Sequence, residues 1–223
     1  MSPKLVMALF LLFAAACLKE FLHVADAAIA ETTLRSVLVA GYWFLKTAIT
    51  SAFAYFVLVR PDSKRKARAP IAIISCAAAA SGAVALQGPD GGVPVGLLLA
   101  GDLLAFACSV WLLASVLALG RCFGMLPEAR GLVTRGPYRL VRHPVYLGEL
   151  GVCAGLVIGA PTLWNAGCAA LILGAQIVRM GLEERALEAE FPEYGEYARA
   201  TPRLLPRTAA RTYRIPSTSP QEA

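Results

Sequence analysis

Charged side chains are scarce in this chain of 223 residues: 16% of its residues are charged, whereas 57% are hydrophobic. A water-soluble domain of this size usually has about 25% charged and roughly 45–50% apolar residues. With so few charges, the chain could not cover so large an apolar interior in water. The composition therefore excludes an ordinary soluble domain and predicts a protein that is solvated by the lipid bilayer.

Histidine and paired cysteines are also lacking. The chain has two histidines, His23 and His143, and its six cysteines form no C-x-x-C pair. A Cys/His zinc site takes four ligands at short, regular spacings, so no metal is expected. Most of the cysteines lie within apolar runs, where a thiol behaves as a small hydrophobic group. Cys122, which follows such a run, is a minor candidate for palmitoylation.

Long apolar runs are what the chain has instead. They cover Leu5–Leu22, Leu34–Val59, Pro70–Leu86, Pro94–Leu119, Val145–Ala160 and Thr162–Val178. A spanning helix needs about 20 residues, which the second and fourth runs supply alone. The last two runs are short, and Pro161 between them predicts a tight helical hairpin. The predicted fold is all-α: a polytopic integral membrane helical bundle with five to six transmembrane helices.

The first apolar run leaves two interpretations open. Lys4 followed by an apolar stretch and Ala14-Ala15-Ala16-Cys17 also resembles a signal peptide with a lipobox-like end. Ala14 stands where leucine is usual in such a motif, so we favour a retained membrane helix.

Positive charge is concentrated in a few segments. All but three of the 21 basic residues lie at Lys4, in residues 60–69, in residues 120–143, or from Arg179 onward. If the N-terminus is cytoplasmic and all six runs cross, these segments share one side, as the positive-inside rule requires. The net charge of +6 then reflects membrane orientation and membrane lipids as partners. Nucleic acid is not expected as a partner, because the basic residues are not interleaved with aromatic ones.

The segment from Leu132 to Tyr146 combines turn chemistry with basic residues. Gly136-Pro137 favours a turn, and Pro144 suits the first turn of a helix. His143 is then placed at a helix mouth, where free backbone N–H groups and arginines make an anion pocket. A basic membrane boundary, with Tyr138 and Tyr146 as interfacial anchors, explains the same residues, and both interpretations stay open.

A second polar cluster follows the last apolar run. Arg179 and Glu183 are four residues apart and share a helix face, either as a surface ion pair or as a site opposite His143. The next stretch, Ala186–Tyr197, is predicted to be a cytoplasmic amphipathic interfacial helix. The implied organisation is N-terminal transmembrane helices over 1–119, a region over 120–207 that holds the hairpin and both polar clusters, and a disordered tail over 208–223.

Among the ionisable residues inside the apolar runs, Glu149 and Lys46 raise a question of function. Ionisable groups at membrane depth are costly and usually face a cavity or the protein interior. Glu149 is one to two turns inside the fifth run, where it could instead be wetted by the interface. Lys46, in the middle of the second run, poses the same question.

Taken together, these patterns resemble the isoprenylcysteine carboxyl methyltransferases and their bacterial and archaeal relatives, and more distantly the phospholipid methyltransferases. The resemblance covers about the last 80–90 residues. Its motifs are specific only in combination. The matching positions are Leu132 to Tyr146, Arg179 to Glu184, Phe191, Tyr194, Tyr197 and Pro202 to Pro206.

The resemblance implies a methyltransferase that binds S-adenosylmethionine at the cytoplasmic end of the hairpin. Arg179 would contact the substrate as the catalytic residue, and a lipophilic acceptor would enter sideways from the bilayer. A carboxylate acceptor would need no base. The residues expected at the cofactor are Leu132, Val133, Tyr138, Arg142, His143, Pro144, Tyr146, Glu183 and Glu184.

Other functions remain possible from the sequence. Carboxyl O-methylation of an isoprenylcysteine-like acceptor is favoured over N-methylation of a phospholipid amine. The run from Arg142 to Glu149 also resembles membrane sterol and enone reductases, which bind NADPH. A transporter would spread polar residues through several helices near the midplane, whereas here they gather at one end. The sequence does not indicate the acceptor or the oligomeric state.

Overall fold

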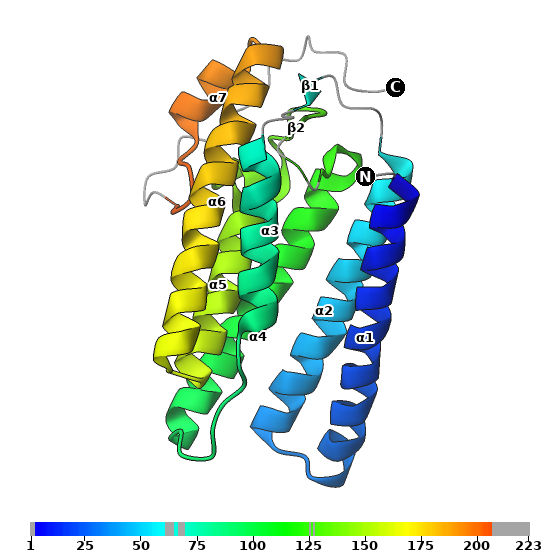
Figure 1. The fold of residues 1–223 in the computed structure, drawn as a ribbon, viewed down its shortest axis with the longest axis vertical. Helices are drawn as coiled ribbons and strands as arrows, with labels where there is room; N and C mark the ends of the chain where they lie inside the picture. Colours follow the sequence, from blue (N-terminus) through cyan, green and yellow to red (C-terminus); the bar gives the residue numbers. More distant parts are fainter. Residues whose placement is uncertain (1–2, 61–64, 67–69, 125, 127, 207–223) are drawn as a thin grey trace.

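The computed structural model describes residues 3–60, 65–66, 70–124, 126 and 128–206 (Figure 1). It confirms the predicted all-α bundle, to which it adds one pair of two-residue antiparallel strands, β1 (Arg65–Lys66) and β2 (Glu128–Ala129). The α-helices are α1 (Pro3–Ala30), α2 (Leu34–Val59), α3 (Pro70–Ala85), α4 (Val95–Leu119), α5 (Pro144–Gly159), α6 (Leu163–Glu190) and α7 (Tyr194–Ala200). The predicted tail, 208–223, lies outside the described residues.

Four of these helices, α1, α2, α4 and α6, are long and apolar enough to cross a membrane. Helices α3 and α5 have 16 residues each, about 24 Å at 1.5 Å per residue, which is shorter than a hydrocarbon core of about 30 Å. Consecutive helices run antiparallel, and the N-terminus, β1, β2 and α7 lie at one end, called here the open end (Figure 1). A multi-pass bundle is therefore supported, while six crossings and a cytoplasmic open end remain predictions.

The predicted hairpin between the last two apolar runs is present. Helix α5 begins with Pro144 at its first position and ends at Gly159, and α6 begins at Leu163. The Thr162 side chain caps α6 by accepting a hydrogen bond from the Asn165 N–H, which satisfies one of the free donors of that helix end. Both helices therefore present their far ends, with His143 and Glu183, to the open end.

The prediction of a single amphipathic helix over Ala186–Tyr197 is wrong. Helix α6 continues without a break to Glu190, and a separate helix, α7, begins at Tyr194. Phe191 is extended (φ −119°, ψ 106°), as expected for the residue before Pro192, because the proline ring excludes the helical conformation there. The loss of hydropathy after Val178 marks the end of the apolar run but not of the helix.

Glycines bring α4 and α5 close together. A Cβ atom on Gly155 would lie 2.6 Å from the Ala105 nitrogen and from the Gly101 oxygen, and one on Gly148 would lie 2.8 Å from Leu112 Cβ. Such small residues allow membrane helices to pack backbone against backbone. Because this face of α5 is used against α4, other α5 side chains are free to face α6.

The remaining helices pack in pairs, α1 on α2, α2 on α4, and α3 on α6. Helices α2 and α3 therefore pack mainly on different partners, and they stand apart in Figure 1. Side chains of both helices line a cavity inside the bundle. One flank of this cavity is thus formed by two helices that are not closely packed on each other.

Candidate active site

The large cavity has a volume of about 1210 Å³ and reaches from the open end into the membrane-spanning part of the bundle. Its wall is largely apolar in the deep part. Polar side chains from α5 and α6 gather near the open end, while Lys46 and Thr50 are polar positions on α2. The deep apolar lining includes Ile49, Ala79, Leu112, Val152, Leu156 and Ile172.

A smaller pocket of about 30 Å³ adjoins the large cavity at the open end. The residues that line only this smaller pocket come from the segment before α5 and from α6 and α7, and include Leu132, Val133 and Tyr194. The two spaces are thus separated by one set of side chains, most of them polar. The shared lining residues are Leu119, Cys122, Tyr138, Arg142, His143 and Glu183.

An ionic cluster around Glu184 holds one wall of this pocket. His143 Nε2–H donates to Glu184 Oε1 at 3.0 Å, because an ionised carboxylate can only accept. Arg203 Nε donates to the same oxygen at 3.2 Å, and Arg142 Nη2 lies 3.4 Å from it. His143 is 4% exposed, so this contact fixes both the ring plane and the nitrogen that carries the proton.

Backbone hydrogen bonds join the same segments. The Arg142 N–H donates to the Pro202 carbonyl at 2.8 Å, and the His143 N–H donates to the Arg203 carbonyl at 3.1 Å. The Pro202–Pro206 segment of the resemblance therefore pairs directly with the chain that enters α5. These two hydrogen bonds hold the backbone of Arg142 and His143 in place.

Buried tyrosines support the turn that precedes α5. Tyr197 Oη donates to the Tyr138 carbonyl at 2.7 Å, and the turn itself begins at Gly136, whose φ of +59° suits glycine. Burial raises the pKa of Tyr138 well above its usual value, and it also raises the pKa values of Tyr194 and Tyr197. These hydroxyls therefore stay protonated, so they can serve as hydrogen-bond donors.

Below His143, polar side chains of α5 and α6 face one another in the large cavity. Tyr146 Oη donates to Glu183 Oε2 at 3.1 Å, and the Arg179 guanidinium carbon lies 5.1 Å from the centre of the Tyr146 ring. One step deeper, Arg179 Nη1 donates to Gln176 Oε1 at 3.0 Å, and Gln176 Nε2 donates to Glu149 Oε2. The cluster of Tyr146, Glu149, Gln176, Arg179 and Glu183 is called here the polar ladder.

The predicted site residues fall into three groups. Tyr146 and Arg179 line only the large cavity. Pro144 and Glu184 line neither space: the Pro144 carbonyl accepts from Trp111 Nε1 at 2.9 Å, and Glu184 is held in its ionic cluster. Their role toward a cofactor remains a prediction. The six that line the small pocket are Leu132, Val133, Tyr138, Arg142, His143 and Glu183.

Gln176 was missed by sequence reasoning, and Arg203, which lies in the matched Pro202–Pro206 segment, was given no role at the site. Gln176 lies three residues before Arg179 on the face of α6 that lines the cavity, so a search for polar residues inside apolar runs would have found it. Arg203 is brought to Glu184 by the chain after α7. No spacing rule in the sequence indicates that contact.

The site has features that fit S-adenosylmethionine. Arg142 Nε is buried and donates to no acceptor among the described residues, so it could receive the carboxylate of a methionyl group. A carboxylate such as Glu183 suits an amine or a ribose hydroxyl. Pockets for ligands of this size usually have about 300–1,000 Å³, so a cofactor would have to occupy part of the large cavity as well.

The model of the phospholipid methyltransferase family matches residues 94–193, from the start of α4 to the break before α7. All of the predicted site residues lie within this segment. The predicted resemblance is thereby confirmed: over this segment the chain matches the family of isoprenylcysteine carboxyl methyltransferase-like membrane methyltransferases. The match supports a membrane methyltransferase as the class of protein, without defining its substrate.

Two curated proteins match a shorter segment. The chain is 44% identical over 79 residues to the cobalt-zinc-cadmium resistance protein CzcN of Cupriavidus metallidurans. It is 35% identical over 79 residues to the nickel-cobalt-cadmium resistance protein NccN of Alcaligenes xylosoxydans xylosoxydans. Each match covers 34% of this chain and 36% of the relative. The chain thus matches about a third of the length of these curated relatives.

The names of these relatives concern resistance to metal ions. In the part of the chain that the structure describes, no group of three or more His, Cys, Asp or Glu side chains is arranged to hold a metal ion.

Proposed function

We propose that this chain is an integral membrane methyltransferase that uses S-adenosylmethionine and methylates a lipophilic acceptor. One observation carries the proposal: the polar wall of Tyr138, Arg142, His143 and Glu183 is shared by a small pocket at the open end and a large, deep apolar cavity. A polar cofactor and an apolar acceptor could meet at such a wall. The wall lies within the segment that matches the methyltransferase family.

The residues of the small pocket would hold the cofactor. Arg142 and His143, at the mouth of α5, would bind its carboxylate, and Glu183 would bind an amine or hydroxyl group. When bound, S-adenosylmethionine supplies a methyl group on a positively charged sulfur, which is already activated for displacement. The protein then has mainly to orient the two reactants and exclude water.

The acceptor would reach this wall from the bilayer. The cavity lining includes residues from α2 and α3, which pack on different neighbours, so a lipid tail could pass between them into the deep apolar part. Its reactive group would then lie beside Arg179. By the positive-inside rule, the basic residues at the open end favour a cytoplasmic active site.

Two acceptor chemistries fit the family. An isoprenylcysteine-like carboxylate, the acceptor favoured by the resemblance, would pair with Arg179 through a bidentate contact. A phospholipid amine is the second candidate, and one observation favours it: two carboxylates, Glu149 and Glu183, line the large cavity and could attract an ammonium group.

Transfer of a labelled methyl group tests the proposal. Detergent-purified protein is incubated with methyl-labelled S-adenosylmethionine and either a farnesylcysteine analogue or phosphatidylethanolamine vesicles. Label in the lipid phase supports the proposal, with base-labile label indicating an ester and stable label indicating nitrogen. Binding of NADPH without binding of S-adenosylmethionine would contradict it and favour the reductase alternative.

A further inference from the structure

Lys46 carries an ammonium group in the middle of α2, and the function above gives it no role. Helix α2 runs from Leu34 to Val59, so roughly 18–20 Å of helix separates Lys46 from either end. An ionisable group at such a depth is costly and usually faces a cavity or the protein interior. Lys46 lines the large cavity, and it lies outside the segment 94–193 that matches the methyltransferase family.

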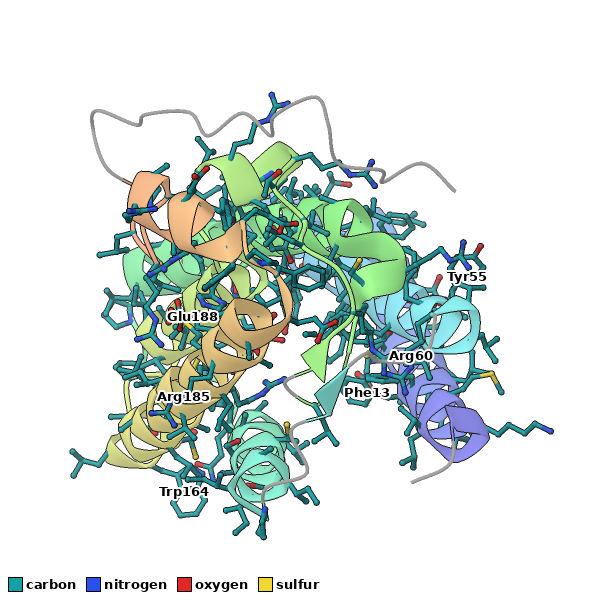
Figure 2. All side chains as sticks on the ribbon, turned by 90° about the horizontal axis from the view of Figure 1, so that it is seen from above. Phe13, Tyr55, Arg60, Trp164, Arg185 and Glu188 are labelled. Carbon is teal, nitrogen blue, oxygen red and sulfur yellow. The ribbon has the colours of Figure 1, made fainter. Side chains whose placement is uncertain are left out.

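Aromatic rings surround this ammonium group. Lys46 Nζ lies 4.6 Å from the centre of the Trp43 ring, 5.5 Å from that of Tyr42 and 5.6 Å from that of Phe13. Phe13 lies on the α1 side of the cavity (Figure 2). Cation–π contacts hold the group in place. Among the described residues, Lys46 forms no salt bridge and its three N–H donors form no hydrogen bond, so they are available to a ligand.

The charges of the cavity wall are unevenly distributed. Both carboxylates come from the polar ladder on α5 and α6, while Lys46 stands on the α2 side. With five basic side chains and two carboxylates, the described wall favours a ligand that carries negative charge. The charged residues that line the cavity, apart from His143, are Lys46, Arg60, Arg130, Arg142, Arg179, Glu149 and Glu183.

Lys46 lies at about the same depth in the bundle as the polar ladder. Helix α4 packs on both α2 and α5, so its residues relate the depths of these two helices. On α2, Ile49 follows Lys46 by three residues and shares a buried cluster with Leu112. On α5, a Cβ atom on Gly148 would lie 2.8 Å from Leu112 Cβ, and Glu149 is the next residue. Lys46 and Glu149 therefore line the same level of the cavity from different helices.

We propose that Lys46 binds an anionic oxygen group, a phosphate or a carboxylate, that the lipophilic acceptor carries in addition to the group that is methylated; this rests on the proposed function. The reacting group lies beside Arg179, the chain lies in the deep apolar part, and the second group reaches Lys46 across the cavity. The ammonium donates charge-assisted hydrogen bonds to it. Lys46 thereby selects anionic acceptors over neutral ones of the same chain length.

A purely structural ammonium group, held by the aromatic rings, is the alternative to test. The two roles differ in ligand selectivity, and three variants separate them. Lys46→Met removes the charge and keeps an unbranched side chain, whereas Lys46→Arg keeps the charge. Lys19→Met is the matched control, because Lys19 is an exposed lysine on α1 that does not line the cavity.

A binding test without cofactor uses dodecyl phosphate and dodecanol, which share one chain length and differ in charge. The wild type should bind dodecyl phosphate about tenfold more tightly or better, and inorganic phosphate at the same concentration should not displace it. Lys46→Met should lose most of this preference, while Lys46→Arg and Lys19→Met should keep it. Equal affinities in the wild type, an unchanged preference in Lys46→Met, or displacement by inorganic phosphate would each overturn the proposal.

Labelled methyl transfer tests the link to the acceptor. Dodecyl phosphate should raise the KM for the acceptor that is methylated, farnesylcysteine analogue or phosphatidylethanolamine, without changing kcat. This inhibition should be severalfold weaker in Lys46→Met, and no inhibition of the wild type would overturn the proposal. Failure to bind S-adenosylmethionine would instead remove the proposed function and the acceptor assignment. The preference for dodecyl phosphate would then still show an anion site at Lys46.

Discussion

Glu184 shows, at the residue scale, how charge is arranged at the open end. It is paired with His143, Arg142 and Arg203, which come from two separate segments. Glu183, the adjacent residue, points instead to Tyr146 and lies 3.9 Å from His143 Nδ1. One carboxylate of the pair therefore stabilises the wall, and the other lines both the pocket and the cavity.

Arg179→Ala should lower the rate of methyl transfer by on the order of 100-fold or more, because the acceptor loses the guanidinium that would orient it. Affinity for S-adenosylmethionine should change by less than about threefold, because Arg142, His143 and Glu183, which would bind the polar groups of the cofactor, are unchanged. A threefold change is smaller than the tenfold change that corresponds to about 1.4 kcal/mol. Cofactor titration and labelled transfer measure the two effects. Arg185→Ala is the matched control, because Arg185 is exposed on the outer side of the same helix (Figure 2).

His143→Ala and Glu183→Ala should each weaken cofactor binding roughly tenfold or more, because a hydrogen bond to a charged group contributes about 1.5–3 kcal/mol. Glu188→Ala, which removes an exposed carboxylate from the same helix (Figure 2), should leave affinity unchanged. Calorimetric titration of each purified variant provides the comparison. Wild-type affinity in both pocket variants would exclude this pocket as the cofactor site.

The residues of the site could be named from the sequence, but their pairing could not. Pro144 and the hairpin at Pro161 are enough to place His143 and Glu183 at the same end of the bundle. Which carboxylate pairs with His143 depends on how α5 and α6 are rotated about their axes. Glu184 was expected at the cofactor, yet it lines neither space, and only the three-dimensional packing distinguishes it from Glu183.

At the scale of elements, the packing of α4 against α5 sets the face that α5 presents to α6. Gly101, Gly148 and Gly155 allow this approach. Their spacing is visible in the sequence, but the partner helix is not. The extension of α6 to Glu190 was also not predicted. Hydropathy marks the part of a helix that lies in the membrane, and it does not mark where the helix ends.

Gly155→Ala should destabilise the bundle, because its Cβ would lie 2.6 Å from backbone atoms of α4. Overpacking of this kind costs about 1–3 kcal/mol, so thermal unfolding in detergent should shift several degrees lower. Gly167→Ala on α6 is the control, since a Cβ there meets nothing within 4 Å, and it should be neutral or slightly stabilising. Equal unfolding temperatures for the two variants would contradict close α4–α5 packing.

At the scale of the whole molecule, the cavity combines an apolar interior with a polar end. Phe13 and Arg60 line it from the α1 and α2 side of the bundle, across from α6 (Figure 2). The composition of the chain predicts a membrane bundle and leaves its interior undefined. A space of this kind arises because α2 and α3 pack on different neighbours, which no pattern in either helix indicates.

Ala83→Trp should lower methyl transfer to a lipid acceptor severalfold while leaving cofactor affinity unchanged. Ala83 lines the large cavity from α3, so an indole there would occupy space needed by an acyl chain. Val84→Trp is the control, because Val84 is the next residue, is 79% exposed and does not line the cavity. Labelled transfer in vesicles compares the two. Equal rates would show that acceptors do not use this part of the cavity.

The central claim, a methyltransferase site at the wall shared by the small pocket and the large cavity, is tested most directly by cofactor titration. Purified wild-type protein and the His143→Ala variant are each titrated separately with S-adenosylmethionine, S-adenosylhomocysteine and NADPH. The account predicts saturable binding of the two adenosyl compounds to the wild type, a clear loss in the variant and no binding of NADPH. Binding of NADPH alone would contradict it.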